Sequence, residues 1–331
     1  MKKIVSFLLI IAFIVFSGCS SRKYFEPEDV VAKVKFDKNL PAKIIDIKRD
    51  GATLKNGQVI TKDGLLDIYL PKGYVYIGGK DYIVGADDCG DVIIKDGKTT
   101  IFRKHFDSKK AVSANISNNI LALLFDNNEI MVYDIKQNKK LYQYSENRIS
   151  AVDAKIASPL FLDSLILFPT LDGKIDIYDK TQNKIIRTII VGTKNEFNNI
   201  IFLKVIGNIL IAATPNKIIS VNPQNINSLN ENIRDVIFLK DRVYILTNDG
   251  EVLLTDENLN ILKSRKYPFA HFVGAIYGKY LYMIEKEGYI IAVDKDLRVS
   301  NIFKLENSID DFIFTSNDKI FYKDRFFQLA K

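Results

Sequence analysis

The chain has few of the residues that build metal sites, disulfide frameworks and aromatic cofactor pockets. Its 331 residues include no tryptophan, two cysteines and two histidines. His105 and His271 each adjoin an apolar residue in an expected strand, so we interpret them as packed or hydrogen-bonded strand residues and expect no metal site. The motifs G-x-S-x-G, H-E-x-x-H and S-D-N are also absent. We therefore expect no enzyme activity, with a glycosidase-like carboxylate pair as the open alternative.

Strong charge of one sign is absent too. The formal net charge is +7, and no run of five like charges occurs. Residues 1–18 contain two of the 47 basic residues and no acidic one, so 45 basic and 40 acidic residues remain without them, a net charge of +5. Because blocks of like charge are the more informative signal, we interpret the surface as an ordinary solvated one and expect no nucleic-acid partner.

The N-terminus carries an export signal. Lys2 and Lys3 precede an apolar run at residues 4–16, which is too short to span a bilayer comfortably and indicates a signal peptide. The run ends in Phe16-Ser17-Gly18-Cys19. This ending resembles the lipobox of bacterial lipoproteins, in which an apolar residue and two small residues precede the cysteine. An ordinary secretory signal followed by an accidental cysteine is the alternative.

The lipobox resemblance implies cleavage before Cys19, a diacylglycerol on its sulfur and an N-acyl chain such as palmitate on its amine. Several acyl chains hold a protein durably on a membrane. Residues 1–18 are then the signal peptide, 19–29 a lipidated tether of at most ~35 Å, at roughly 3.3 Å per residue, and 30–331 the folded domain. Position 20 lacks the Asp that retains such lipoproteins in the inner membrane, which indicates the outer membrane, facing the periplasm.

Two short segments could be mistaken for ligand sites. Asp87-Asp88-Cys89-Gly90-Asp91 lacks the spacing of a calcium loop, and Gly78-Gly79-Lys80-Asp81 lacks the upstream Gly and following Ser/Thr of a phosphate loop. We predict a hairpin turn at each. With Cys19 lipidated, Cys89 is the only thiol, so no disulfide can form within the chain.

Strand-forming residues and Asx-Gly turns are abundant. The module at residues 164–190 reads as an apolar strand, a turn at Asp172-Gly173, an alternating strand, a polar turn and an apolar strand. Strands with similar endings recur at Asp96, Asp134, Asp179, Asn222, Asp256, Asp294 and Asp324. The 228 residues from Asp96 to Asp324 span six intervals with a mean of 38. This period predicts an all-β protein, a β-propeller of four-stranded antiparallel blades.

Seven repeats predict seven blades, with eight as the alternative. The last unit, residues 309–329, provides three strands, and a propeller must close its ring to leave no exposed sheet edge. We therefore predict that an N-terminal strand from residues 30–70 completes this blade. If residues 43–70 form a blade of their own, the count is eight. In the turns after the repeated strands, we expect Asn138, Asn183 and Asn258 to adopt the left-handed conformation.

From residue 74 to 331 the modules resemble the PQQ-type propeller repeat, whose skeleton WD40-type propellers share. Together with the lipobox, the chain is similar to the BamB-type lipoproteins of the outer-membrane β-barrel assembly machinery, which have eight blades. PQQ-dependent dehydrogenases place tryptophans in this repeat, where this chain has Tyr142 and Arg187. We therefore expect no cofactor and no quinoprotein catalysis.

The resemblance implies a membrane-anchored periplasmic scaffold that binds envelope proteins, among which it points to the β-barrel assembly machinery. It also implies a monomer outside that complex. A partner could bind the loops of one ring face or add an extended segment to a blade edge. The alternatives are a ligand-sensing or enzymatic site in the central funnel, which requires convergent polar groups there, and a surface-exposed adhesin. Beyond Cys19 the sequence identifies no functional residue.

Overall fold

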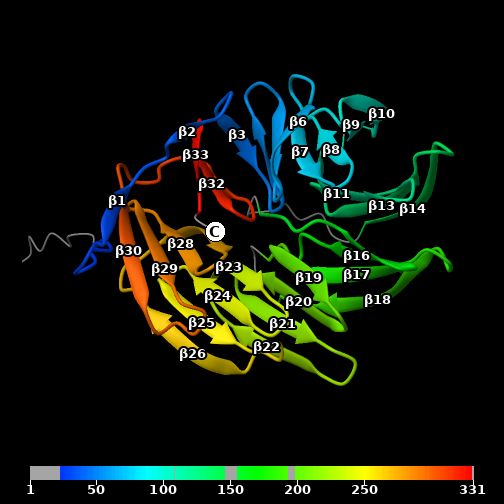
Figure 1. Ribbon diagram of the computed structural model, residues 1–331. Helices are drawn as coiled ribbons and strands as arrows, with labels where there is room; N and C mark the ends of the chain where they lie inside the picture. Colours follow the sequence, from blue (N-terminus) through cyan, green and yellow to red (C-terminus); the bar gives the residue numbers. More distant parts are fainter. Residues whose placement is uncertain (1–22, 108, 146–154, 193–197, 330–331) are drawn as a thin grey trace, which may run out of the picture.

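Short strands make up all the regular structure in this computed structural model. The structure describes residues 23–107, 109–145, 155–192 and 198–329, and in these ranges it has 33 strands and no helix. The strands form mainly four-stranded sheets arranged around a central axis (Figure 1). The predicted all-β propeller is confirmed. Within the described ranges, no helix of the length and apolarity needed to cross a membrane is found.

Eight blades follow one another along the chain, and in the first seven the strands run in sequence order from the inner to the outer edge. In blade 8 the N-terminal β2 forms the outer strand. Blades 1 to 4 comprise β3 (Ile44–Ile47), β4 (Gly51–Leu54), β5 (Gln58–Thr61) and β6 (Gly64–Tyr69); β7 (Val75–Gly78), β8 (Ile83–Ala86), β9 (Asp91–Asp96) and β10 (Thr99–His105); β11 (Ala111–Ser117), β12 (Ile120–Phe125), β13 (Glu129–Asp134) and β14 (Lys139–Ser145); β15 (Leu160–Leu162), β16 (Leu165–Pro169), β17 (Lys174–Asp179) and β18 (Lys184–Ile190). Blades 5 to 8 comprise β19 (Phe202–Ile206), β20 (Ile209–Thr214), β21 (Lys217–Val221) and β22 (Ile226–Asn230); β23 (Ile233–Phe238), β24 (Val243–Thr247), β25 (Glu251–Thr255) and β26 (Ile261–Lys266); β27 (Phe272–Tyr277), β28 (Leu281–Glu285), β29 (Tyr289–Val293) and β30 (Ser300–Leu305); β31 (Ile313–Thr315), β32 (Lys319–Tyr322), β33 (Arg325–Gln328) and the N-terminal β2 (Lys38–Asn39).

The count is eight, the alternative that the sequence left open. Residues 43–70 form blade 1, which escapes a repeat count because its first three strands have only four residues each. The predicted N-terminal closure is confirmed, since β2 pairs antiparallel with β33 and becomes the outer strand of blade 8. The first and last parts of the chain therefore share one blade.

A second N-terminal strand lies on the outer rim. The strand β1 (Ala32–Val34) pairs in parallel with β30, which gives blade 7 a fifth strand. Residues before it are also attached to the ring: Phe25 is buried and makes edge-to-face contacts with Tyr267 and Tyr289. The folded part thus begins before residue 30, because Phe25 fills an apolar site between blades 6 and 7.

The core lies between neighbouring blades. In blade 3, for example, β12 and β13 are almost entirely buried, whereas β14 is largely exposed. The apolar clusters combine side chains from adjacent sheets, as where β24 and β25 pack against β27 to β29. Each sheet has two apolar faces that only its neighbours can cover, so the stability of every blade depends on a closed ring.

Two of the three asparagines predicted to be left-handed adopt that conformation. Gly173 has φ +80°, and Asn138 and Asn183 have φ +51° and +54°, as predicted. In the third turn the left-handed residue is Leu259, with φ +65°, and not Asn258. The Leu259 side chain is buried in the cluster between blades 5 and 6, which offsets the steric cost of this conformation.

Candidate functional site: the central channel

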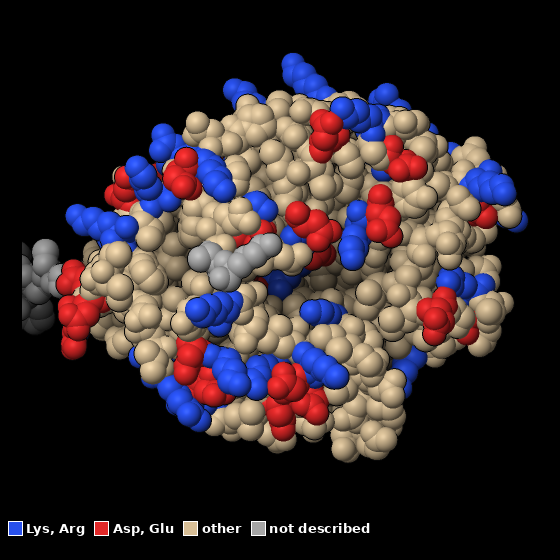
Figure 2. All heavy atoms as spheres, viewed as in Figure 1, with Lys and Arg blue, Asp and Glu red and all other residues tan. Residues whose placement is uncertain are grey.

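A channel of about 690 Å³ runs into the centre of the ring. Every blade contributes to its wall, mainly through the inner strand or the loop beside it. The space-filling view shows the hollow at the centre of one face, with basic side chains inside it (Figure 2). The funnel alternative requires convergent polar groups at this position, and they are present.

Basic side chains outnumber acidic ones in the channel wall. The basic residues are Lys48, Arg49, Lys62, Lys80, Lys155 and Lys204, and the acidic residues are Asp50 and Asp235. The wall therefore carries a formal surplus of four positive charges, which Asp46 beside it reduces to three by pairing with Lys48 at 3.0 Å. Apolar rings and aliphatic side chains from β19, β23, β27 and β31 fill the spaces between them.

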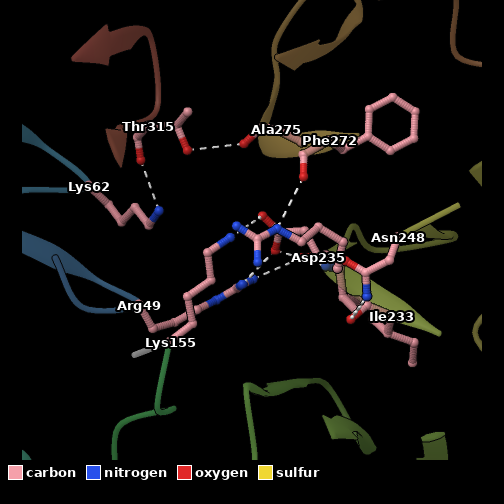
Figure 3. A network of polar contacts seen from close by, with 11 residues as sticks. Arg49, Lys62, Lys155, Ile233, Asp235, Asn248, Phe272, Ala275 and Thr315 are labelled. Atoms are coloured by element: carbon pink, nitrogen blue, oxygen red, sulfur yellow. Dashed lines mark hydrogen bonds and ion pairs between the residues drawn. The ribbon is translucent and has the colours of Figure 1, made fainter. Parts of the chain in front are cut away.

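The acidic centre of this group is Asp235, in the inner strand of blade 6. Its carboxylate accepts a hydrogen bond from Arg49 Nη1 at 2.5 Å and forms an ion pair with Lys155 Nζ at 3.3 Å (Figure 3). Arg49 Nη2 also donates to the Val236 carbonyl at 2.9 Å, and its guanidinium lies 4.9 Å from the centre of the Phe202 ring. Side chains from blades 1, 4, 5 and 6 are thus joined across the axis.

Local backbone features direct these side chains inward. Arg49 lies in the turn between β3 and β4, which the Lys48 N–H closes by donating to the Gly51 carbonyl at 2.7 Å. In blade 6 the pairing of β23 with β24 shifts register between Ile233 and Asp235. Such bulges re-aim side chains. The inner strands of blades 1, 3 and 7 have comparable shifts, so the bulge belongs to the fold. At the matching position blade 1 also carries a carboxylate, Asp46, which pairs with Lys48 at 3.0 Å.

The surrounding cations determine the protonation of Asp235. Burial alone would raise the pKa of its carboxyl, but Arg49 and Lys155 outweigh that effect and hold the pKa well below its usual range. Asp235 is therefore ionised at any physiological pH and neutralises part of the charge of two cations.

Two further lysines have no such counter-ion. Lys62 Nζ donates to the Thr315 carbonyl at 2.8 Å, and Lys204 Nζ donates to the Phe238 carbonyl at 3.0 Å. Among the described residues, no carboxylate lies within ion-pairing distance of either amine. Burial, reinforced by repulsion from Arg49, lowers the pKa of Lys62 to about 8, and the same two causes lower the pKa of Lys204.

Among the described residues that the sequence singled out, Lys80 lies in the channel wall and the others lie elsewhere. Cys19 falls outside the described residues. Cys89 is exposed in the β8–β9 hairpin, and its N–H donates to the Asp87 carboxylate at 3.0 Å; Lys80 lies in the β7–β8 hairpin, so both predicted turns are confirmed. His105, on the outer strand β10 of blade 2, contacts Asp91 of the neighbouring β9, and His271 directly precedes β27.

The two positions where related repeats carry tryptophan are also remote from the channel. Tyr142 packs against Tyr178 of the next blade, with ring centres 5.0 Å apart. Arg187 lies on β18, the outer strand of blade 4. The structure brings His105 and Asp91 into contact, but apart from Lys80 none of these candidates lies in the channel wall, and the other channel residues were missed.

Comparison with known proteins identifies relatives in sequence and in fold. No protein-family model matches the chain. The plasminogen-binding protein PgbB of Helicobacter pylori, from strains J99 and 26695, is 29% identical, and the alignment covers 97% of this chain and 70% of that protein. Among solved structures, BamB from Moraxella catarrhalis has a TM-score of 0.62 at 16% identity, covering 88% of this chain and 95% of its own.

The C-terminal WD40 domain of Sif2 is similar in the same way, with a TM-score of 0.67 at 14% identity, covering 92% of this chain and all of that domain. At such identities the likeness to BamB and Sif2 establishes a shared propeller fold. The similarity to PgbB extends over nearly the whole chain.

Proposed function

We propose that this protein is a lipid-anchored scaffold of the bacterial envelope that binds another protein and catalyses no reaction. The observation that carries the proposal is the alignment of nearly the entire chain with a protein named for binding plasminogen. The propeller fold supports it, since its loops and blade edges offer large surfaces for partners.

The outer rim provides one route for binding. The pairing of β1 with β30 places an added extended strand on the outer edge of blade 7. In the described residues, β18, β22 and β26 form the outer edges of their own blades. Each carries exposed apolar side chains, namely Ile186, Ile190, Ile226, Ile261 and Leu262. An extended segment of a partner protein can add to such an edge in the same way.

The anchor rests on the lipobox and is tested at its cysteine. Replacing Cys19 by Ala removes the sulfur to which a diacylglycerol would be attached, so we expect the protein to leave the membrane fraction and lose incorporated palmitate. Cys89→Ala is the matched control, because it removes the other thiol from an exposed turn and leaves the lipobox intact. Unchanged membrane association of Cys19→Ala would contradict the anchor.

The membrane and its face are a separate part of the proposal. We place the protein in the outer membrane, facing the periplasm, and the surface-exposed adhesin is the alternative. Density separation of the two membranes, followed by protease treatment of intact cells, distinguishes them. Release of the propeller from intact cells would show external display and would exclude a purely periplasmic role.

Two partners are proposed, each from a different observation. The fold shared with BamB supports a component of the β-barrel assembly machinery, and the similarity to PgbB supports plasminogen. Crosslinking in intact cells tests the first, and surface plasmon resonance with purified plasminogen tests the second. Recovery of assembly components would favour the first partner and saturable plasminogen binding the second; failure of both would refute the protein-binding proposal in these two forms.

A further inference from the structure

We propose that the central channel is a binding site for a small polyanion that carries carboxylate or phosphate groups. This site is separate from the rim surfaces described above. It has a wall from eight blades, a surplus of basic side chains and a volume of about 690 Å³. That volume lies within the range of small-molecule sites, roughly 300–1,000 Å³.

The charge surplus is the first argument. After Asp235 has paired with Arg49 and Lys155, the remaining carboxylate in the wall, Asp50, accepts a hydrogen bond from Ser158 at 3.1 Å. Like charges gathered in a partly dehydrated cavity repel one another more strongly than they would in bulk water. If these side chains served only to hold the blades together, balanced charge would suffice. An anion bound in the channel would remove the repulsion between the surplus cations.

The arrangement of the lysines is the second argument. Lys62 and Lys204 come from blades 1 and 5, and within the described ranges their bonds to backbone carbonyls occupy one of the three donors of each ammonium group. Further N–H donors are therefore available to the oxygen atoms of a ligand. Carboxylate and phosphate oxygens accept charge-assisted hydrogen bonds, which are about twice as strong as neutral ones.

Rigid neighbours support these donors. Lys62 Nζ lies 4.5 Å from the centre of the Phe314 ring, and Thr315, whose carbonyl it contacts, donates its hydroxyl to the Ala275 carbonyl at 3.0 Å (Figure 3). Arg49 is fixed by two acceptors and by the Phe202 ring. Donors that are already oriented lose little freedom when a ligand binds, which favours affinity.

The lowered pKa of Lys62 is consistent with an anion-binding site in the channel. Asp50 and Asp235 face its amine and raise its pKa, but burial, Arg49 and Lys155 lower it by more. A polyanion beside the amine would favour the charged form and raise this pKa. Anion binding above pH 8 should therefore take up a proton, and the affinity should fall as the pH rises from 7 to 9.

Calorimetry and thermal denaturation of the full chain in a mild non-ionic detergent test the proposal. The probes are citrate, which supplies carboxylates, and tripolyphosphate, which supplies phosphates, each compared with chloride at equal ionic strength. We expect at least one probe to bind with a stoichiometry near one and to raise the melting temperature by several degrees. The two probes distinguish carboxylate from phosphate as the preferred group.

The decisive variant is the double substitution Lys62→Met and Lys204→Met, for which we expect affinity to fall at least ten-fold. The control replaces Lys72 and Lys136 by Met, two exposed lysines outside the channel wall, and changes the net charge equally. Melting without ligand shows whether each variant folds. Binding of the partner protein at the rim should be unchanged in both variants, so failure of the channel proposal is distinguishable from failure of the proposed function.

Three results would overturn the inference. One is the absence of binding by either probe, and another is an equal loss of affinity in the control variant, which would indicate a general charge effect. The third is binding of a polyglutamate peptide but of neither small probe, which would assign the channel to an acidic protein segment.

Discussion

The inner and outer edges of the blades are built from the same repeat but differ in how far their charged side chains are exposed to water. At the rim, Asp67 of the outer strand β6 and Lys98 of the β9–β10 turn form an ion pair in which both side chains are mostly exposed to water. At the inner edge, Asp235 and its two cations are largely enclosed. Water screens the first pair, whereas the second group depends on its partners for charge neutralisation. The comparison shows that position in the blade, more than residue type, decides how much a charged group contributes to the free energy of unfolding.

The same substitution made at both edges tests this difference most directly. Asp235→Asn leaves Arg49 and Lys155 without their carboxylate in the channel, and removing one partner of a buried pair costs about 3–5 kcal/mol of unfolding free energy. Asp67→Asn, on the outer strand, should cause no measurable change. Urea denaturation of the two variants measures the difference. Similar losses in both would show that the channel network is solvated like the rim.

Within ten residues, the N-terminal segment contains one buried and one exposed apolar side chain. Leu40 is buried between blades 8 and 1, so Leu40→Ala should lower the unfolding free energy by about 2–4 kcal/mol through lost apolar contacts and the cavity left behind. Val31 lies on the rim and is exposed, so Val31→Ala should change it by less than about 0.5 kcal/mol. Denaturation midpoints test both. A small effect at Leu40 would mean that the ring tolerates a loosened closure.

Removing a charge from the channel should stabilise the protein. The pKa of Lys62 is about 8 when folded and 10.5 in the unfolded chain, so the unfolded state binds more protons between these pH values and stability rises with pH across that window. Lys62→Met should abolish this rise and increase the unfolding free energy at pH 7 by about 1–3 kcal/mol, reduced by the lost hydrogen bond to Thr315.

The measurement for Lys62→Met is a series of denaturation curves from pH 7 to 11, in which the difference from the unsubstituted protein should shrink as the pH increases. Lys72→Met is the control and should show no such trend. If Lys62→Met were less stable at pH 7 and equally so at pH 10, the charge of Lys62 would be fully neutralised in the fold, contrary to the proposed surplus.

The smallest effect is expected on the outer surface. Ile261 in β26 is half exposed, and threonine keeps its branching at Cβ. Ile261→Thr should therefore change the unfolding free energy by no more than about 0.5 kcal/mol. A loss above about 1 kcal/mol in the isolated protein would show that this side chain is covered, and would weaken the case for a partner surface on the rim.

The repeat made the architecture predictable from sequence. Strand ends such as Asp179 carry their own turn signal, and in the structure its carboxylate accepts the Thr181 N–H at 2.7 Å and the Gln182 N–H at 3.1 Å. The closure by an N-terminal strand followed from the missing fourth strand of the last blade. Blade 1 was harder to count because its short strands have no long alternating run. The attachment of Phe25 was missed because nothing around it is periodic.

The channel was less predictable, for reasons of geometry. Arg49 and Lys62 lie beside the Asx-Gly turns at Asp50 and Asp63, and such turns define the local backbone but not what the ring places opposite them. Asp235 points inward at a bulge, and no residue pattern locates a bulge. The available signal was a basic residue next to several inner turns. It indicates a basic channel only when the blades are known to form a circle.

The docking of Phe25 also determines how the ring would sit on a bilayer. Lys23, which lies 5.3 Å from the centre of the Phe269 ring, is four residues from Cys19, a span of at most ~14 Å at about 3.5 Å per residue. With acyl chains on Cys19, the side of the disc formed by blades 6 and 7 would rest close to the lipid headgroups. The disc would then stand on its edge, with its axis along the membrane plane and its central opening toward the surrounding fluid.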